Sequence, residues 1–237
     1  MDEALTLLSF GPQGWSDEIA SGVILTVALA LATLPFGLFL GFFIALAKDS
    51  KEPGLRLASE IYTTIFRGLP ELLTLFIVFY GAQIIVRRIA GLIVDQPTIE
   101  INSFVAGMFA LGLVFSSYAS EAFLSAFKGI QAGQYEGGFA IGLTRFQTMR
   151  LVIAPQLIRL ALPALSNLWM ILLKDTALVS VIGLADVLRQ AGIAARVTKE
   201  AFLFFSIACL IYLALSIISS FGLGWIERWS RRGEAVR

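Results

Sequence analysis

The chain alternates between long apolar runs without a charged residue and short polar segments. Three of the runs are uninterrupted: residues 19–47, 101–120 and 201–226 contain no Asp, Glu, Lys or Arg. A helix needs about 20 mostly apolar residues to cross the hydrocarbon core of a bilayer. Each of these runs is therefore long enough for one span. Pro35, Gly37 and Gly41 lie inside the first run, and such residues in membrane helices either kink the helix or permit close packing.

Two further runs, at 60–86 and 157–185, are apolar but carry internal charges. We expect their charged portions to face other helices rather than lipid, because a charge in hydrocarbon is costly. With these two runs the sequence predicts five spans, so the fold class is all-α and the protein is a polytopic membrane protein. The charges that interrupt the two runs are Glu60, Arg67, Glu71, Arg159, Lys174 and Asp175.

The composition supports the same class. Hydrophobic residues make up 57% of the 237 residues, charged residues make up 15%, and the mean hydropathy is +0.82. A soluble domain carries about 25% charged residues, so a single soluble core is excluded. The net charge of +1 gives no general nucleic-acid footprint, and nucleic acid is not an expected partner.

Residue types that are rare or missing exclude several kinds of catalytic and metal-binding site. The sequence has no histidine, which excludes His-based catalysis and His-ligated metal sites, and no metal or cofactor is expected on this chain. Its one cysteine, Cys209, lies in an apolar run and is expected to be buried and inert. The first 20 residues contain four acids and no Lys or Arg, the opposite of the basic region of a secretory signal.

The distribution of basic residues predicts the orientation. With five spans, the two ends of the chain lie on opposite sides of the membrane. Cytoplasmic segments are enriched in Lys and Arg, and an outside N-terminus places eleven such residues inside against five outside. The prediction is therefore N-out and C-in, with a periplasmic segment at 1–18, a transmembrane domain at 19–226, a cytoplasmic loop at about 121–156 and a cytoplasmic tail at 227–237.

The cytoplasmic loop contains a polar, glycine-rich stretch, QYEGGFAIGLTRFQTMRLVIAP, at residues 134–155. Gly142 is placed to end one helix through a positive φ, and Thr144 with Gln147 forms a capping-box pattern that starts another. Two short helices with a break at Gly142 are predicted. The apolar residues of this corner either pack against the bundle or form a docking element for a partner: Phe139, Ile141, Leu143 and Phe146.

The spacing in this stretch resembles the EAA loop of ATP-binding-cassette importer permeases. That loop has Glu-Ala-Ala, then glycine after three residues, then Ile-x-Leu-Pro after nine more, and Glu136, Gly142 and Pro155 stand at the same intervals. Two glycines, at 137–138, replace the alanines. The likeness is greatest to Q-type permeases for histidine, other basic amino acids and opines, although Leu124 stands where relatives usually carry arginine. Further segments resemble the same family: RGLPELL at 67–73, Tyr118 with Glu121, and KDTALVSVIGL at 174–184.

The resemblance implies the type I importer permease fold, a location in the bacterial inner membrane, and translocation of a polar amino acid. Basic amino acids such as histidine, arginine, lysine and ornithine, or opines, are favoured. The implied partners are a cytoplasmic ATPase dimer that binds ATP and Mg²⁺, a second permease subunit (a paralogue or a second copy), a periplasmic substrate-binding protein and membrane lipid. This chain has no phosphate loop and is not expected to be an enzyme. The implied ATPase-coupling residues are Glu136, Gly137, Gly138, Phe139, Gly142 and Pro155.

Charged residues inside the predicted spans are candidates for a substrate pathway. Arg67 and Glu71 are spaced i,i+4, so the plainer interpretation is a structural ion pair on one helix. For Glu121 the plainer interpretation is an interfacial residue at the end of the third span. For Lys174 and Asp175, half-buried packing or gating stands beside substrate contact.

Two other functional classes stay open from the residues alone. A secondary transporter or channel needs no ATPase, but such proteins often have more spans or internal repeats, and no repeat is visible here. An intramembrane enzyme needs a catalytic pair within the membrane, for which Asp175 and Asp186 are the only aspartates deep enough. Finally, the glycines at 137–138 weaken their helix by about 1 kcal/mol each relative to alanine. We therefore expect a partner to order this helix, and alanine at both positions to strengthen or preserve coupling.

Overall fold

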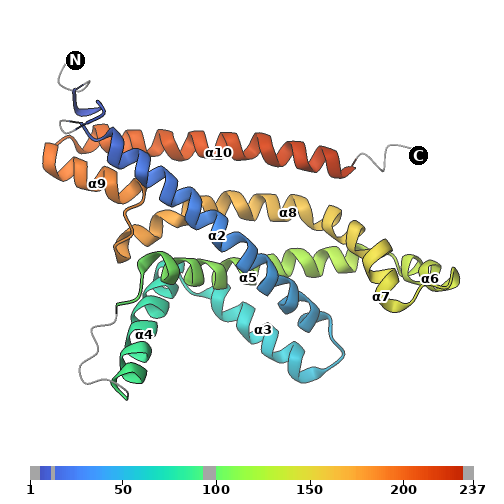
Figure 1. Cartoon of the computed structure of the whole chain (residues 1–237). Helices are drawn as coiled ribbons and strands as arrows, with labels where there is room; N and C mark the ends of the chain where they lie inside the picture. The colour runs from blue at the N-terminus through green and yellow to red at the C-terminus, as the bar shows by residue number, and fades with distance from the viewer. Residues whose placement is uncertain (1–5, 12–13, 93–99, 232–237) are drawn as a thin grey trace.

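The computed structural model describes residues 6–11, 14–92 and 100–231, and the regular structure in these ranges is entirely helical. Parts of the predicted periplasmic segment and tail lie outside the described residues. The elements follow one another as α2 (Ser16–Asp49), α3 (Pro53–Gly68), α4 (Glu71–Gly91), α5 (Ser103–Gly129), α6 (Ala132–Ala140), α7 (Arg145–Thr148), the π-helix η1 (Met149–Ile153), α8 (Ala154–Asp175), the 3₁₀-helix η2 (Thr176–Ile182), α9 (Val187–Thr198) and α10 (Ala201–Arg231) (Figure 1).

The predicted number of spans is confirmed in the described part of the chain. Five helical segments are long and apolar enough to cross a membrane. The fourth of them is a continuous helical rod in which α7, η1, α8 and η2 follow one another without a break. The five segments are Ser16–Asp49, Glu71–Gly91, Ser103–Gly129, Arg145–Ile182 and Ala201–Ser230.

The segment predicted as the second span, 60–86, forms two helices rather than one. Leu69, which joins α3 to α4, has φ −89° and ψ 141°, because the ring of the following proline disfavours a helical conformation at this position. Arg67 therefore lies in the last turn of one helix, which ends at Gly68, while Glu71 begins the next. The i,i+4 ion pair expected between Arg67 and Glu71 is wrong, since that pairing requires both residues on one helix.

The third span extends further than its charges indicated. The prediction ended it at residue 120, because Glu121 follows. In the structure α5 runs on to Gly129, and Phe123 and Phe127 are buried beyond the charge. The helix therefore continues beyond the predicted end of the span, and the interfacial position of Glu121 stays a prediction. The helix tolerates this carboxylate because basic side chains from two other helices pair with it, as described below.

Small residues bring α2 and α5 into close contact. A Cβ atom added to Gly41 would lie 2.9 Å from both the Ala119 Cβ and the Ser116 carbonyl oxygen, and one added to Gly112 would overlap the Phe36 ring. Such close approach holds membrane helices together by van der Waals packing, which confirms the role expected for Gly41. The main apolar core follows α5, with α2, α4 and α8 packed around it.

A second apolar cluster joins α9 and α10 to the beginning of α2. Phe204 and Ala208 of α10 are buried in it together with Val187 and Ala191 of α9. Cys209 is exposed, so the expectation that it is buried is wrong. The reason is geometric: α10 packs through the side that carries Phe204 and Ala208, and the next residue is turned about 100° away around the helix.

The two ends of the bundle are built from different elements (Figure 1). The beginning of α2 and helix α9 lie at one end. The connection from α2 to α3, the corner formed by α6 and α7, and the last turns of α10 lie at the other. The chain therefore enters and leaves the bundle at opposite ends, as an odd number of spans requires.

Candidate functional site

Two carboxyl groups lie together in a small cavity between α4, α5 and α8. Glu71 begins α4 and Asp175 ends α8, and both side chains line the cavity. Apolar side chains such as Leu111 and Leu172, together with Tyr118, line much of the remaining wall. The cavity volume is ≈ 20 Å³, which is room for little more than one water molecule. Two carboxyl groups in a mostly apolar wall form a site suited to a cation.

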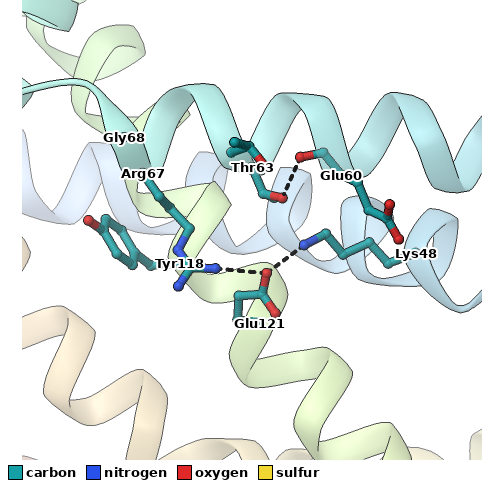
Figure 2. Close-up of a pocket in the computed structure, with 8 residues that line it drawn as sticks. Lys48, Glu60, Thr63, Arg67, Gly68, Tyr118 and Glu121 are labelled. Carbon is teal, nitrogen blue, oxygen red and sulfur yellow. Dashed lines mark hydrogen bonds and ion pairs between the residues drawn. The ribbon is translucent and has the colours of Figure 1, made fainter.

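A larger polar pocket, of ≈ 580 Å³, lies where α2, α3 and α5 meet (Figure 2). The Glu121 Oε1 atom accepts hydrogen bonds from the Lys48 ammonium and from Arg67 Nη1, the latter at 2.9 Å. The Arg67 guanidinium also lies over the Tyr118 ring, with Cζ 5.6 Å from the ring centroid, in a cation–π arrangement. One carboxylate on α5 thus pairs with cations from two other helices.

Lys48 is the member of this cluster that the sequence analysis did not single out. In the sequence it is the first charge of the short hairpin after the first apolar run, but it lies in the last turn of α2 with only 8% of its side chain exposed. Its partner Glu121 is 73 residues away in the chain. A pairing over that separation leaves no local pattern, so only the structure reveals it.

A third pocket, of ≈ 430 Å³, continues along α5 toward Gly129 and is bordered by Asn167 of α8. Tyr118 lines all three pockets, and Glu121 lines the second and third. The pockets therefore form a series along α5. Lys174 is exposed and lines none of these three. The remaining predicted pathway residues come together as two pairs, Arg67 with Glu121 and Glu71 with Asp175.

The predicted helix break in the polar stretch is confirmed. Gly142 has φ +82°. The Leu143 N–H donates to the Gly138 carbonyl at 3.1 Å, and the Gly142 N–H donates to the Phe139 carbonyl at 3.0 Å. These two bonds define a Schellman motif, which closes a helix through a residue of positive φ. The turn therefore depends on glycine at 142.

The predicted capping box is also confirmed. The Gln147 N–H donates to Thr144 Oγ1 at 3.3 Å, and the Thr144 N–H donates to Gln147 Oε1 at 2.9 Å. Helix α7 then continues through the π-helix η1, Met149–Ile153, into α8. Pro155 follows directly after the π turn, within the first turn of α8.

The corner formed by α6 and α7 exposes large apolar side chains beside a carboxylate. Ile141 is 75% exposed, Phe146 73% and Phe139 47%, and Glu136 is exposed on α6. Clustered exposed apolar side chains with a polar neighbour are typical of an interaction surface. Of the two alternatives left open by the sequence, the exposure of these three side chains favours a docking element over a packed internal loop.

The two adjacent glycines of α6 have different surroundings. A Cβ atom added to Gly137 meets nothing within 4 Å, whereas one added to Gly138 would lie 2.6 Å from Thr148 Cγ2 and 2.9 Å from Thr148 Oγ1. Alanine therefore fits at 137 without displacement and conflicts with the packing at 138. The expectation that alanine is harmless at both positions does not fit the structure, because Gly138 permits a close contact between α6 and α7.

A helical membrane chain with carboxyl groups between its spans and an exposed corner for a partner has the features of a transport permease. The chain matches the family described as binding-protein-dependent transport system inner membrane component over residues 34–232, and it belongs to that family. The matched range includes all three pockets and the α6–α7 corner.

The chain is similar along most of its length to several transport permeases. It is 41% identical to the nopaline transport system permease protein NocQ of Agrobacterium fabrum, over 97% of this chain and 98% of the relative. It is 38% identical to the histidine/lysine/arginine/ornithine transport system permease protein HisQ of Salmonella typhimurium (91% and 94%) and 36% identical to the arginine ABC transporter permease protein ArtQ of Haemophilus influenzae (92% and 96%).

Solved structures share the fold. The chain resembles a subunit in a crystal structure of an amino acid ABC transporter with histidines, with a TM-score of 0.76 and 33% identity, over 90% of this chain and 94% of that one. It also resembles a chain of the MetNI methionine ABC transporter in an inward-facing conformation, with a TM-score of 0.73 and 19% identity, over 91% and 97%. The second likeness shows the fold alone.

Proposed function

We propose that this chain is the permease subunit of an ATP-binding-cassette importer for a polar amino acid or opine with a cationic side chain. The observation that carries the substrate class is the pairing of Glu71 with Asp175 in an apolar cavity between three spans. A guanidinium or ammonium group placed between two carboxyl groups forms charge-assisted hydrogen bonds with both. The printed names of the arginine and histidine/lysine/arginine/ornithine relatives support the same class.

The cavity must enlarge to admit such a substrate, because ≈ 20 Å³ is too small for an amino acid. Separation of α4 from α8 opens it, and movement of whole helices is the usual way in which membrane transporters expose a site to one side and then the other. Farther along α5, the ion pairs of Glu121 with Lys48 and Arg67 close the path. Passage of substrate then requires these pairs to separate.

Energy for these movements comes from a separate cytoplasmic ATPase, which binds ATP and Mg²⁺ and docks at the α6–α7 corner. Exposed Phe139, Ile141 and Phe146 fill an apolar groove of that partner, and Glu136 fixes the orientation through a charged or backbone contact. The exposure of these four side chains supports the docking, and the sequence of this chain has no phosphate loop of its own.

The remaining partners follow from membership in a family of binding-protein-dependent inner membrane components. A periplasmic binding protein delivers the substrate, and a second permease subunit, a paralogue or a second copy of this chain, completes the pore in the bacterial inner membrane. The α6–α7 corner and the end of α10 face the cytoplasm, while α9 faces the periplasm. The common location of the first two at one end of the bundle supports this orientation (Figure 1).

Transport of arginine into proteoliposomes tests the proposal. The vesicles contain the complete complex with its ATPase and binding protein, and uptake is compared between arginine and citrulline, its neutral isostere. We expect Glu71→Gln and Asp175→Asn each to raise the KM for arginine roughly 10- to 100-fold, the loss expected when one hydrogen bond to a charged group is removed. Glu52→Gln, an exposed carboxyl at the beginning of α3, is the control and leaves the KM unchanged.

Two results would overturn the proposal. Uptake that persists when the ATPase is omitted would identify a secondary transporter or channel. An unchanged arginine KM in both carboxyl variants would show that the pair between α4 and α8 does not take part in substrate recognition.

A further inference from the structure

We propose that Gln134, Gly138, Thr148 and Gln156 form a rigid joint between α6 and the rod that begins with α7. This joint, rather than the turn at 141–144 alone, carries a displacement of α6 into the membrane-spanning part of the chain. The inference rests on the proposed docking of an ATPase on α6, and it assigns the residues that pass the motion on after docking.

The first contact of the joint is between backbone and side chain. Gly138 is buried against Thr148, which is only 1% exposed, and a single added methyl group would overlap the Thr148 side chain. Packed contacts of this kind do not deform continuously, so they transmit a displacement rather than absorb it. The helix that carries Thr148 therefore follows any movement of α6 at this point.

The second contact of the joint is a shared amide. Gln156 Nε2 donates one hydrogen bond to Gln134 Oε1 at 3.0 Å and another to the Val152 carbonyl at 2.9 Å. Both hydrogens of the amide are thus in use, one toward α6 and one toward the rod itself. The Gln156 side chain therefore connects the beginning of α6 to the beginning of α8.

The π turn accounts for the alignment of the two contacts. Gln134 and Gly138 are spaced i,i+4 and share one face of α6. Thr148 and Gln156 are eight residues apart, and in a uniform α-helix they would be turned about 80° from each other. A π-helix closes i→i+5 bonds and so turns less per residue. Its presence at Met149–Ile153 brings the two side chains back toward a common face.

Pro155 gives a local cause for this π turn. Proline has no N–H to donate, and its ring conflicts with the carbonyl four residues earlier in an α-helix. Widening the preceding turn relieves that conflict, and the π turn ends two residues before Pro155. The proline of the motif therefore acts on the joint through the geometry of the rod.

Glu136 of the docking surface lies on the side of α6 opposite to the joint. Glu136 is exposed and is turned about 160° from Gly138 around the helix. Tyr135 anchors a third side of α6 by packing against the main core with Met149 and Val152. Burial raises the pKa of the Tyr135 phenol, and the nearby Asp49 carboxylate raises it further. A partner can thus hold the outer side of α6 while the inner side stays fastened to the rod.

A charge exchange tests the amide contact in the complete reconstituted complex. The measurement is the ratio of arginine taken up to ATP hydrolysed, with complex assembly checked by co-purification of the ATPase. We expect Gln134→Ala and Gln156→Ala each to lower this ratio roughly two- to tenfold, the range for one lost hydrogen bond. The double variant loses no more than either single one, because coupled residues are not additive. Gln134→Glu with Gln156→Lys restores the ratio through an ion pair.

A size exchange tests the packing contact. Gly138→Ala is expected to lower the same ratio, and Thr148→Ala in that background is expected to restore it by removing the two atoms that the new methyl group would overlap. Gly133→Ala is the matched control, because it lies on the same helix with nothing within 4 Å of its added Cβ. It leaves the ratio at the wild-type value.

The outcomes separate this inference from the proposed function. If the ATPase fails to co-purify with the wild-type chain, the proposed function is wrong, and the joint with it. If the ATPase binds and drives uptake but the glutamine variants keep the wild-type ratio, or lose it additively without rescue by the charge exchange, the joint is wrong and the proposed function stands. Rescue by both exchanges, with co-purification of the ATPase unchanged in every variant, supports the joint over a loss of complex assembly.

Discussion

The sequence Ile-Gly-Leu occurs at two helix ends on opposite sides of the molecule, at residues 141–143 and 182–184. Both glycines have positive φ, +82° and +104°. In both turns the leucine N–H donates to the carbonyl five residues earlier, at 3.1 Å and 3.4 Å. Each turn is followed by a capping residue that starts the next helix, Thr144 in one case and Asp186 in the other. The backbone device is the same.

The surroundings of the two turns differ. Ile141 is 75% exposed, whereas Ile182 is 7% exposed and belongs to the main core. The buried turn is also held by polar contacts, since the Ser103 hydroxyl donates to the Ile182 carbonyl at 2.8 Å. Three residues can thus determine a turn without determining its burial. The copy left exposed is the one at the proposed docking corner.

The largest effect expected from this comparison concerns the two isoleucines. Ile182→Ala removes a buried side chain from the core and costs roughly 2–5 kcal/mol of folding stability. Ile141→Ala, the matched change in the exposed copy, stays within about 0.5 kcal/mol but weakens association with the ATPase. Thermal unfolding of the purified chain and co-purification of the ATPase measure the two effects. Equal losses of stability would show that both turns are structural.

The next effect concerns the capping residues, one of which titrates. Asp186 is fully buried and accepts a hydrogen bond from the Arg189 N–H at 2.9 Å. Burial raises the pKa of its carboxyl from 3.8 to about 6, and the backbone hydrogen bond offsets only part of the shift. The folded state therefore binds this proton more tightly than the unfolded state, so the contribution of this carboxyl to stability is fully present below about pH 4 and is lost as the pH rises through about 6.

Asp186→Asn keeps an acceptor for the cap and removes the titration. We expect wild-type protein to lose roughly 1–3 kcal/mol of unfolding free energy between pH 4 and pH 7 relative to this variant. Melting temperatures at both pH values measure the difference. The other cap supplies the control, because Thr144→Ser does not change the pH dependence. Parallel pH profiles of the melting temperature for wild type and Asp186→Asn would show that titration of Asp186 does not affect the stability of the protein.

The features that sequence predicted are those encoded by neighbouring residues. The break at Gly142 and the capping box at Thr144 and Gln147 each depend on residues within a few positions. Three of the five apolar runs are likewise continuous in the sequence. The break between Arg67 and Glu71 is also encoded locally, by the proline at 70, although the i,i+4 spacing of the two charges favours an ion pair on one helix. There the backbone requirement of proline is stronger than a surface ion pair, which contributes little stability.

The features that sequence could not predict depend on distant contacts. The pairing of Lys48 with Glu121 spans 73 residues, and it is the reason that α5 continues past a charged residue. The tight contact of Gly138 with Thr148 depends on how the intervening turn folds α6 back onto the rod. Exposure of Ile141 and burial of Ile182 follow from the assembly of whole helices, which no three-residue pattern contains.

The smallest effect, and the most direct test of the shared turn, comes from alanine at the two glycines. A non-glycine residue at positive φ costs roughly 1–2 kcal/mol. The space around both positions is open: nothing lies within 4 Å of a Cβ added to Gly142, and the Ser103 hydroxyl lies 3.7 Å from one added to Gly183. We therefore expect Gly142→Ala and Gly183→Ala to lower stability by nearly equal amounts, as measured by chemical or thermal unfolding in the same detergent. Asparagine, which tolerates this conformation better than alanine, should recover part of the loss at both sites. A stability cost at Gly183 much greater than at Gly142 would show that the buried surroundings of the second turn add to the cost of alanine. The two turns would then share a sequence but differ in what they require at the glycine.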